Sequence, residues 1–232
     1  MGFILQSVAD AIGLIAHGDR DLLAAIATTL RVSVSSTAIA SVLALPVALL
    51  LALREFHGKR AVVVLLRTAL AVPTVAIGLL VYAFLTRNGP LGQYHLLFTR
   101  TAIVIGQVLL IVPLITALAH AALQHRARTV HEEARLLGAP PLAAAWRVLG
   151  EMRLGIRTAL LTGFGRVISE VGVALILGGN IRGLTRTLTT AITLETSQGD
   201  FPRAFALAIV LLTLVLLINL ILLPEARHGR SE

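Results

Sequence analysis

The sequence predicts an all-α polytopic membrane protein, built from an N-terminal interfacial helix and five transmembrane helices. The first observation is composition: 56% of the 232 residues are hydrophobic and 14% are charged, against about 25% charged residues in ordinary soluble domains. The mean hydropathy is +0.88. The second observation is that the apolar residues form long blocks, and about 20 such residues cross a hydrocarbon core. Too little of this chain could face water for it to be soluble.

The segment 1–18 is expected to lie on the membrane surface as an interfacial helix. Its apolar residues Ile4, Val8, Ile12 and Ile15 recur at spacings of four and three. Polar residues fall on another part of the helical wheel. An amphipathic helix of this kind buries one face at the level of the lipid headgroups.

Five apolar blocks are interpreted as membrane spans, and they cover residues 22–53, 61–85, 102–123, 154–178 and 204–223. As one helix, the first block would be about 48 Å long at about 1.5 Å per residue, against a core of about 30 Å. We therefore expect its early part to emerge or to pack against protein, and we expect Pro46 to kink it. Short connections leave room for a single transmembrane domain over residues 1–232 and for no appended soluble domain.

The basic residues predict an N-terminus outside and a C-terminus in the cytoplasm. The formal net charge is +8, and Lys59 is the single lysine among 20 Lys and Arg residues. One side of the membrane receives ten of them: Arg54, Lys59, Arg60, Arg126, Arg128, Arg135, Arg147, Arg153, Arg227 and Arg230. The other side receives six: Arg20, Arg87, Arg100, Arg182, Arg186 and Arg203. The more basic side is cytoplasmic by the positive-inside rule, so the charge is a topological signal and we expect no nucleic-acid partner.

Missing motifs exclude ATP hydrolysis and covalent chemistry by this chain. No Gly-x-x-x-x-Gly-Lys-Ser/Thr occurs, and Lys59 is followed by Arg60, so a phosphate-binding P-loop is excluded. The chain has no cysteine, which excludes disulfides and thiolate metal sites. The run His131-Glu132-Glu133 lacks the second His that a zinc-peptidase helix requires. We predict no catalytic residue, no metal site and no cofactor bound by this chain.

The longest cytoplasmic connection, residues 129–147, contains a short helix and a strong stop. From His131 it reads His-Glu-Glu-Ala-Arg-Leu-Leu-Gly-Ala-Pro-Pro. We expect Glu132 and Glu133 in the first turn of the helix, where they are favourable against its dipole. Gly138 and the two prolines are expected to end it, and the chain is expected to continue from there into the fourth span. A helix that stands off the membrane with small residues exposed can seat in a groove of a partner.

This stretch resembles the signature of the transmembrane permease subunits of binding-protein-dependent ABC importers: Glu-Ala-Ala, three residues, Gly, nine residues, Ile, one residue, Leu-Pro. The matching residues are Glu132, Ala134, Leu137, Gly138 and Ala139, with Val148 at the Ile position. Glu133 replaces the first Ala, and Gly150-Glu151 stand where Leu-Pro is expected. The resemblance implies that residues 132–139, Glu133 included, form an ATPase-coupling helix, and that ATP is bound by the partner subunit. The alternative is an ordinary amphipathic connector.

The fourth span carries Arg166 and Glu170 within its apolar sequence. An Arg or Asp at the centre of a lone inserting helix costs about 2.5 to 3.5 kcal/mol, so the two together cost on the order of 5 to 7 kcal/mol. The twelve Leu, Ile, Val and Phe residues of 154–177 return about 4 to 7 kcal/mol. Because these two free energies nearly cancel, we expect the helix face that carries Arg166 and Glu170 to turn toward protein or a water-filled path. A structural pin between helices and a lining of the pathway both remain open.

The stretch 166–190 looks like the tungstate-type permeases, relatives of the molybdate and sulfate permeases. From Gly178 it reads Gly-Gly-Asn-Ile-Arg-Gly-Leu-Thr-Arg-Thr, whereas molybdate permeases carry Gly and Phe around the Glu and a Pro at the position of Arg182. The candidate pathway or gate residues are Arg166, Ser169, Glu170, Gly179, Asn180, Arg182 and Arg186. Guanidinium groups and helix N-termini can bind the oxygens of a tetrahedral oxo-dianion. The alternative for Arg182 and Arg186 is contact with a binding protein or lipid headgroups alone.

The resemblance implies a homodimeric permease in a bacterial or archaeal cell membrane, surrounded by lipid. Its expected partners are an ABC ATPase subunit, an extracytoplasmic oxyanion-binding protein and a second copy of the chain, and the expected cargo is tungstate. Molybdate or sulfate import is the nearest alternative. A channel or secondary transporter without an ATPase is an alternative of another class, against which the pattern at 132–139 argues. A membrane-embedded enzyme is disfavoured, because the sequence has no clustered ligands and no paired nucleophile and base.

Overall fold

The computed structural model describes residues 9, 12–13 and 19–222, so the predicted interfacial helix at 1–18 lies almost entirely outside the described residues. The regular elements of the described part are helical: α2 (Arg20–Leu53), α3 (Lys59–Ala69), α4 (Thr74–Leu85), the short 3-10 helix η1 (Gly92–Tyr94), α5 (Arg100–Leu123), α6 (Ala127–Leu136), α7 (Pro141–Glu151), α8 (Arg153–Ile168), α9 (Gly172–Gly178), α10 (Leu188–Ser197) and α11 (Phe201–Leu222). The predicted all-α class is confirmed.

Within this part of the chain, three helices are long and apolar enough to cross a membrane by themselves: α2, α5 and α11. Two further pairs, α3 with α4 and α8 with α9, pass the same test only when each pair is taken together. By length and composition, the described part of the chain therefore has up to five spans. Each of the predicted spans 61–85 and 154–178 consists of two helices and not one, because α3 and α4 meet at a bend of 101° and α8 and α9 at a bend of 55°.

The two bends have different physical causes. The α3–α4 bend coincides with Pro73, the N-cap of α4, which has no amide hydrogen and disfavours helical backbone at the preceding residue. No proline occurs at residues 169–171, where α8 gives way to α9. There the interruption is held open by side chains from other helices, which supply partners to the freed backbone groups.

The long helix α2 packs on α5 through a stripe of small residues. Positions 36, 40, 44, 48 and 52 of α2 are Ser, Ala, Ala, Ala and Ala, and all are buried. They lie against large α5 side chains such as Ile111 and Ile115, both 0% exposed. Small residues at a spacing of four let two helix backbones approach closely in a membrane. The helix continues through Pro46, so this proline does not end it.

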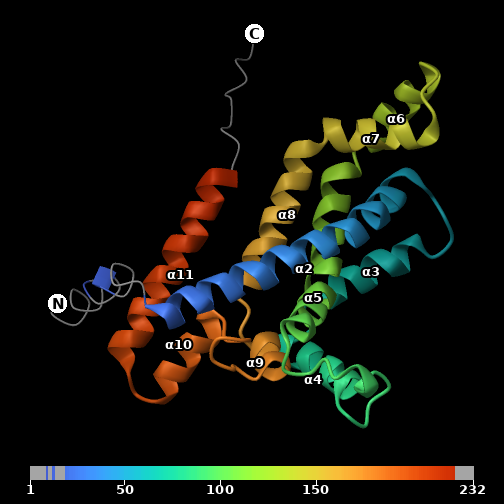
Figure 1. Ribbon diagram of the computed structural model, residues 1–232. Helices are drawn as coiled ribbons and strands as arrows, with labels where there is room; N and C mark the ends of the chain where they lie inside the picture. Colours follow the sequence, from blue (N-terminus) through green and yellow to red (C-terminus); the bar gives the residue numbers. More distant parts are fainter. Residues whose placement is uncertain (1–8, 10–11, 14–18, 223–232) are drawn as a thin grey trace.

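The early part of α2 packs against protein, as predicted from its excess length. Leu22 and Ala25 are buried together with Leu188 of α10 and Leu207 of α11. Figure 1 shows α5, α8 and α11 running in similar directions, with α2 crossing them. The α6–α7 hairpin lies at one end of this bundle, whereas α4, α9 and α10 lie at the opposite end (Figure 1). The two predicted sites therefore occupy opposite ends of the spans.

Candidate functional site

The α6–α7 hairpin contains the predicted coupling residues. Its first helix, α6, ends just before Gly138, as the sequence predicted. Gly138 has a φ of +87°, a left-handed conformation that glycine adopts at little cost. The amide of Gly138 donates to the Arg135 carbonyl (3.0 Å), and that of Ala139 donates to the Ala134 carbonyl (3.0 Å). Helix α7 then begins with Pro141, a residue suited to a first helical turn.

The position of the acidic residues in the hairpin differs from the prediction. Helix α6 begins at Ala127, so Glu132 and Glu133 lie in its second half and not in its first turn. The motif that begins at His131 located the second half of this helix but not the preceding helical turn. After the turn, the chain continues through α7, which ends at Glu151, and Met152 into α8.

The hairpin has a buried base and an exposed tip. Ala127 and Val130 of α6, with Val148 of α7, are buried in one cluster with Ala52 of α2 and Leu123 of α5. Leu136 and Leu137, at the end of α6, are 88% and 90% exposed. A cleft of about 450 Å³ lies between the two helices, and it is lined by Arg126, Val130, Glu133, Ala134, Leu137, Ala139, Ala143, Arg147 and Glu151. A force on the tip would thus reach the ends of the spans through a packed base.

An ion-pair junction at Glu55 joins the hairpin to the end of α2. The Glu55 carboxylate accepts from Lys59 Nζ at 2.9 Å and from Arg128 Nη2, and Arg128 Nε donates to the Ala52 carbonyl at 3.4 Å. The hydrogen bond from Lys59, together with Arg128, holds the pKa of Glu55 below its ordinary value. Glu55 and Arg128 are 73 positions apart, so local sequence patterns could not find this contact.

Arg166 and Glu170 form an ion pair at the interruption between α8 and α9. Arg166 Nη1 donates to Glu170 Oε2 at 2.6 Å. The Glu170 side chain is 3% exposed and that of Arg166 is 40% exposed. Glu170 Oε1 also accepts from the amide of Val173 (3.3 Å), in the first turn of α9. The two residues are four positions apart, and α8 ends between them.

Side chains from three other helices stabilise this interruption. Gln107 of α5 donates through Nε2 to the Val167 carbonyl (3.3 Å) and accepts from Ser36 of α2 (2.8 Å). The hydroxyl of Thr189 donates to the Glu170 carbonyl (2.9 Å). Backbone groups released from a helix inside a membrane must find such partners. Sequence reasoning missed Gln107 and Thr189, although a Gln within an apolar span is itself a signal of buried polar contact.

Helix α8 exposes a polar stripe. Thr158, Thr162 and Ser169 are exposed and lie near Arg166 on the helical wheel, at spacings of three and four. Their hydroxyls donate to the carbonyls of Leu154, Thr158 and Gly165 at 3.0, 2.8 and 2.9 Å, so each is satisfied within its own helix. By contrast, the exposed side chains of α11 include Leu212, Leu216 and Leu220. A half-exposed Arg at membrane depth faces protein or water and not lipid.

The remaining predicted residues lie in the loop 179–187, where they make contacts within the chain. Asn180, with a φ of +51°, accepts from Arg186 Nε at 3.1 Å and donates to the Thr190 carbonyl at 3.3 Å. Arg182 forms a two-point ion pair with Asp21 of α2, which raises the pKa of the Arg182 guanidinium further. The structure therefore brings Arg166, Ser169 and Glu170 together, and holds the loop arginines in separate contacts.

The loop is also fixed from α5 and by close packing. Arg100 Nε donates to the Leu184 carbonyl at 2.7 Å. Gly179, with a φ of +67°, lies against the Phe98 ring so closely that an added Cβ would approach it to 2.7 Å. In the described ranges, no three His, Asp or Glu side chains come together as metal ligands. What this site offers chemically is guanidinium groups and a buried carboxylate.

Comparison with known proteins gives consistent matches over most of the chain. The family model described as "Binding-protein-dependent transport system inner membrane component" matches residues 44–223. A probable anion ABC transporter permease protein of Haloferax volcanii is 40% identical over 83% of this chain and 85% of its own length. The tungstate uptake system permease protein TupB of Campylobacter jejuni is 35% identical over 95% and 92%. The molybdenum transport system permease protein ModB of Haemophilus influenzae is 30% identical over 73% and 78%.

Proposed function

The chain belongs to the family of binding-protein-dependent transport system inner membrane components, and from this membership we propose that it is the permease subunit of an ABC importer that moves tungstate into the cell. The choice of tungstate rests on the similarity to a tungstate uptake permease across 95% of the chain. The similarity to a molybdenum permease is lower and covers 73%. Molybdate is therefore the second candidate, followed by sulfate.

The permease has no catalytic role of its own in this proposal, and ATP hydrolysis takes place on a separate ATPase subunit. The α6–α7 hairpin supports this division of labour. It exposes Leu136 and Leu137 almost completely, at 88% and 90%, while Ala127, Val130 and Val148 fix its base to the spans. Glu132 and Gly138 lie beside this exposed end. An exposed apolar tip on a rigid base suits a helix that seats in a partner's groove.

The polar stripe of α8 is the proposed wall of the translocation path. Two copies of the chain would place two such stripes face to face, so that Arg166 meets water and the oxyanion, and not lipid. Glu170 is then the positioning residue that holds the Arg166 guanidinium. A conduit has to release its ion, so the selective high-affinity site belongs on the extracytoplasmic binding protein. Arg182 and Arg186 are proposed to contact that protein at the outer end.

The proposed membrane orientation follows the basic residues, with the hairpin in the cytoplasm. A gradient-driven channel or secondary transporter would not need the hairpin. The test is co-purification of the permease with an ABC ATPase subunit of the same organism, followed by ATPase assays with the binding protein loaded with tungstate, molybdate or sulfate. We expect stimulation that is strongest with tungstate. Absence of a stable ATPase complex would exclude an ABC importer, and stronger stimulation by molybdate or sulfate would reassign the ion.

A further inference from the structure

The exposed apolar side chains of the hairpin fall into two groups that point to two partners. Leu136 and Leu137 belong to the end of α6, and Figure 1 shows this end standing far from the spans. Leu142 and Trp146 belong to α7 and are 72% and 66% exposed. Helix α7 runs crosswise over the ends of α5 and α8 (Figure 1). One group therefore stands off the bundle, whereas the other lies at its edge.

Helix α7 is amphipathic, and its two arcs face different surroundings. With about 100° between successive residues, Arg147 and Glu151 share one arc, and both line the cleft that separates α7 from α6. Leu142, Trp146 and Leu149 share the opposite arc. Leu149 packs against the hydrophobic cluster at the ends of the spans. The apolar arc thus begins in the protein core and continues outward to the exposed Trp146.

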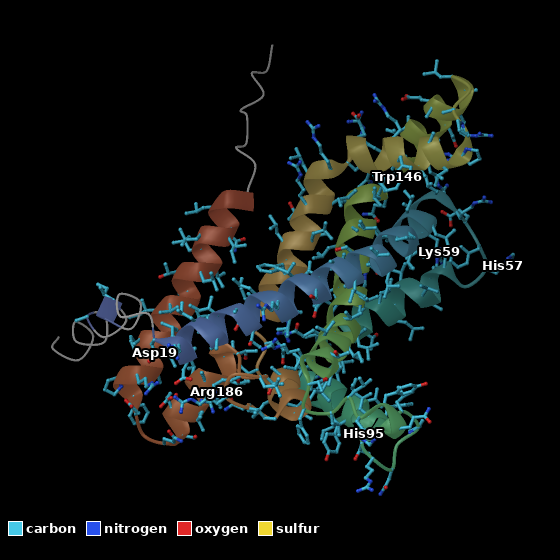
Figure 2. All side chains as sticks on the ribbon, in the orientation of Figure 1. Asp19, His57, Lys59, His95, Trp146 and Arg186 are labelled. Carbon is cyan, nitrogen blue, oxygen red and sulfur yellow. The ribbon has the colours of Figure 1, made fainter. Side chains whose placement is uncertain are left out.

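The position of this arc matches the headgroup layer of a bilayer. Figure 2 shows Trp146 on the side of α7 that is turned toward the spans. Tryptophan is enriched where one end of a side chain is apolar and the other is wet, at the membrane interface. Arg147, on the cleft side of α7, and Arg153, at the start of α8, are exposed at the same end of the bundle. They complement the negative charge of a cytoplasmic leaflet.

We propose that the Leu142 and Trp146 arc of α7 inserts into the headgroup layer of the cytoplasmic leaflet and fixes the depth of the hairpin. The occupant of this surface is phospholipid, which leaves the tip of α6 to the ATPase. The assignment of the leaflet rests on the proposed function, because that function places the hairpin in the cytoplasm. The anchor would let α6 transmit an ATPase movement along the membrane surface without lifting the hairpin away from it.

The experiment uses the fact that Trp146 is the single tryptophan of the chain, so its fluorescence reports this side chain alone. The permease is reconstituted in vesicles that contain phospholipid brominated near the headgroup end of its acyl chains. We expect strong loss of Trp146 emission, weak quenching by aqueous acrylamide, and no change when the ATPase is added. A Trp146→Phe, Leu137→Trp variant moves the reporter to the tip, where acrylamide should quench it and ATPase addition should shift its emission.

Three results would overturn the proposal. Trp146 that is quenched by acrylamide and spared by bromolipid would be in water, and a shift on ATPase addition would place this arc in the ATPase contact. Trp146 that responds to neither quencher would be buried against a second copy of the chain, which also excludes a lipid anchor. The bromolipid measurement needs only the permease, so failure to bind an ATPase would refute the proposed function without deciding this inference.

Discussion

At the scale of the residue, Glu170 accepts hydrogen bonds from two neighbours. One carboxylate oxygen accepts from Arg166 at 2.6 Å and the other from the amide of Val173 at 3.3 Å. With 3% of its side chain exposed, this carboxylate has no access to bulk water. Arg166, at 40% exposed, reaches outward from the same junction. Loss of the partner should therefore cost more for the buried Glu170 than for Arg166, which can reach water.

This difference in exposure predicts different stabilities for the two single variants. Arg166→Gln leaves the buried Glu170 without a cation, and removing one partner of a buried pair costs about 3 to 5 kcal/mol. Glu170→Gln keeps an acceptor for the Val173 amide and leaves an Arg166 that can reach water, so we expect a smaller loss. The double variant should be more stable than Arg166→Gln. The melting temperatures of the unchanged protein, the two single variants and the double variant, four versions in all, measure these differences.

Transport by the same four versions separates structure from pathway. If Arg166 lines the path, the double variant recovers stability while oxyanion uptake stays lost, because the positive charge is still missing. Recovery of uptake in the double variant would make the pair a structural pin. Equal melting temperatures in all four versions would contradict the burial of Glu170.

Gly138 is the residue at which a side chain would test the hairpin without disturbing its packing. An added Cβ meets nothing within 4 Å, so the cost inside the chain is the left-handed backbone alone, about 1 to 2 kcal/mol for an ordinary residue. Gly138→Phe should insert and dimerise but lose substrate-stimulated ATPase activity. Gly138→Asn, which tolerates this backbone, is the matched small variant and should retain most of the stimulation. Full stimulation with Phe at this position would remove the turn from the coupling contact.

At the scale of the element, the contact between α2 and α5 is the most extensive helix pair, and it depends on side-chain size. Ala44 of α2 is 0% exposed and lies in one cluster with Ile111 and Ile115 of α5. Ala44→Leu should destabilise the protein by about 1 to 3 kcal/mol, because it forces a well-packed contact apart. Val42→Leu, at a position that is 73% exposed, is the matched control and should change little. Thermal unfolding in detergent measures both, and an unaffected Ala44→Leu variant would show that the two helices do not pack closely.

The sequence predicted where most helices lie, but it did not predict where they are interrupted. Hydropathy located the spans, and Gly138 with Pro140 and Pro141 located the hairpin turn, because these are local properties. The interruption at 169–171 depends on Gln107 and Thr189, which lie far along the chain from it. No local pattern could show that these partners would be present. The start of α6 at Ala127 was missed for a similar reason, since its first turn is fixed by burial against α2 and α5.

At the scale of the whole molecule, the arrangement of basic residues predicts the topology. A reporter fused after Arg227, which lies beyond the described residues, should read cytoplasmic, and one placed at Gly89 should read external. The reason is that the loops near Arg54 and Arg128 carry more positive charge than those near Arg100 and Arg182, and the positive side stays inside. Reversed labelling would place the α6–α7 hairpin outside the cell, where it could not meet an ATPase.

The family could be predicted from one short stretch, whereas the assembly could not. Residues 132–139 carried the resemblance, and the family match over 44–223 confirmed it. The predicted coupling and pathway roles remain predictions, because they depend on surfaces of partner subunits. The loop arginines illustrate the limit: Arg182 was a pathway candidate by its charge, yet it pairs with Asp21 in the folded chain, a contact across 161 positions.

The most direct test of the account is uptake of tungstate into sealed vesicles that contain the permease, its ATPase subunit and the loaded binding protein. The account predicts that tungstate accumulates only when ATP is supplied on the hairpin side and the binding protein on the other side. It further predicts that omitting any one of the three proteins abolishes accumulation. Tungstate uptake that proceeds without ATP, driven by an ion gradient alone, would contradict the assignment of this chain to an ATP-driven importer.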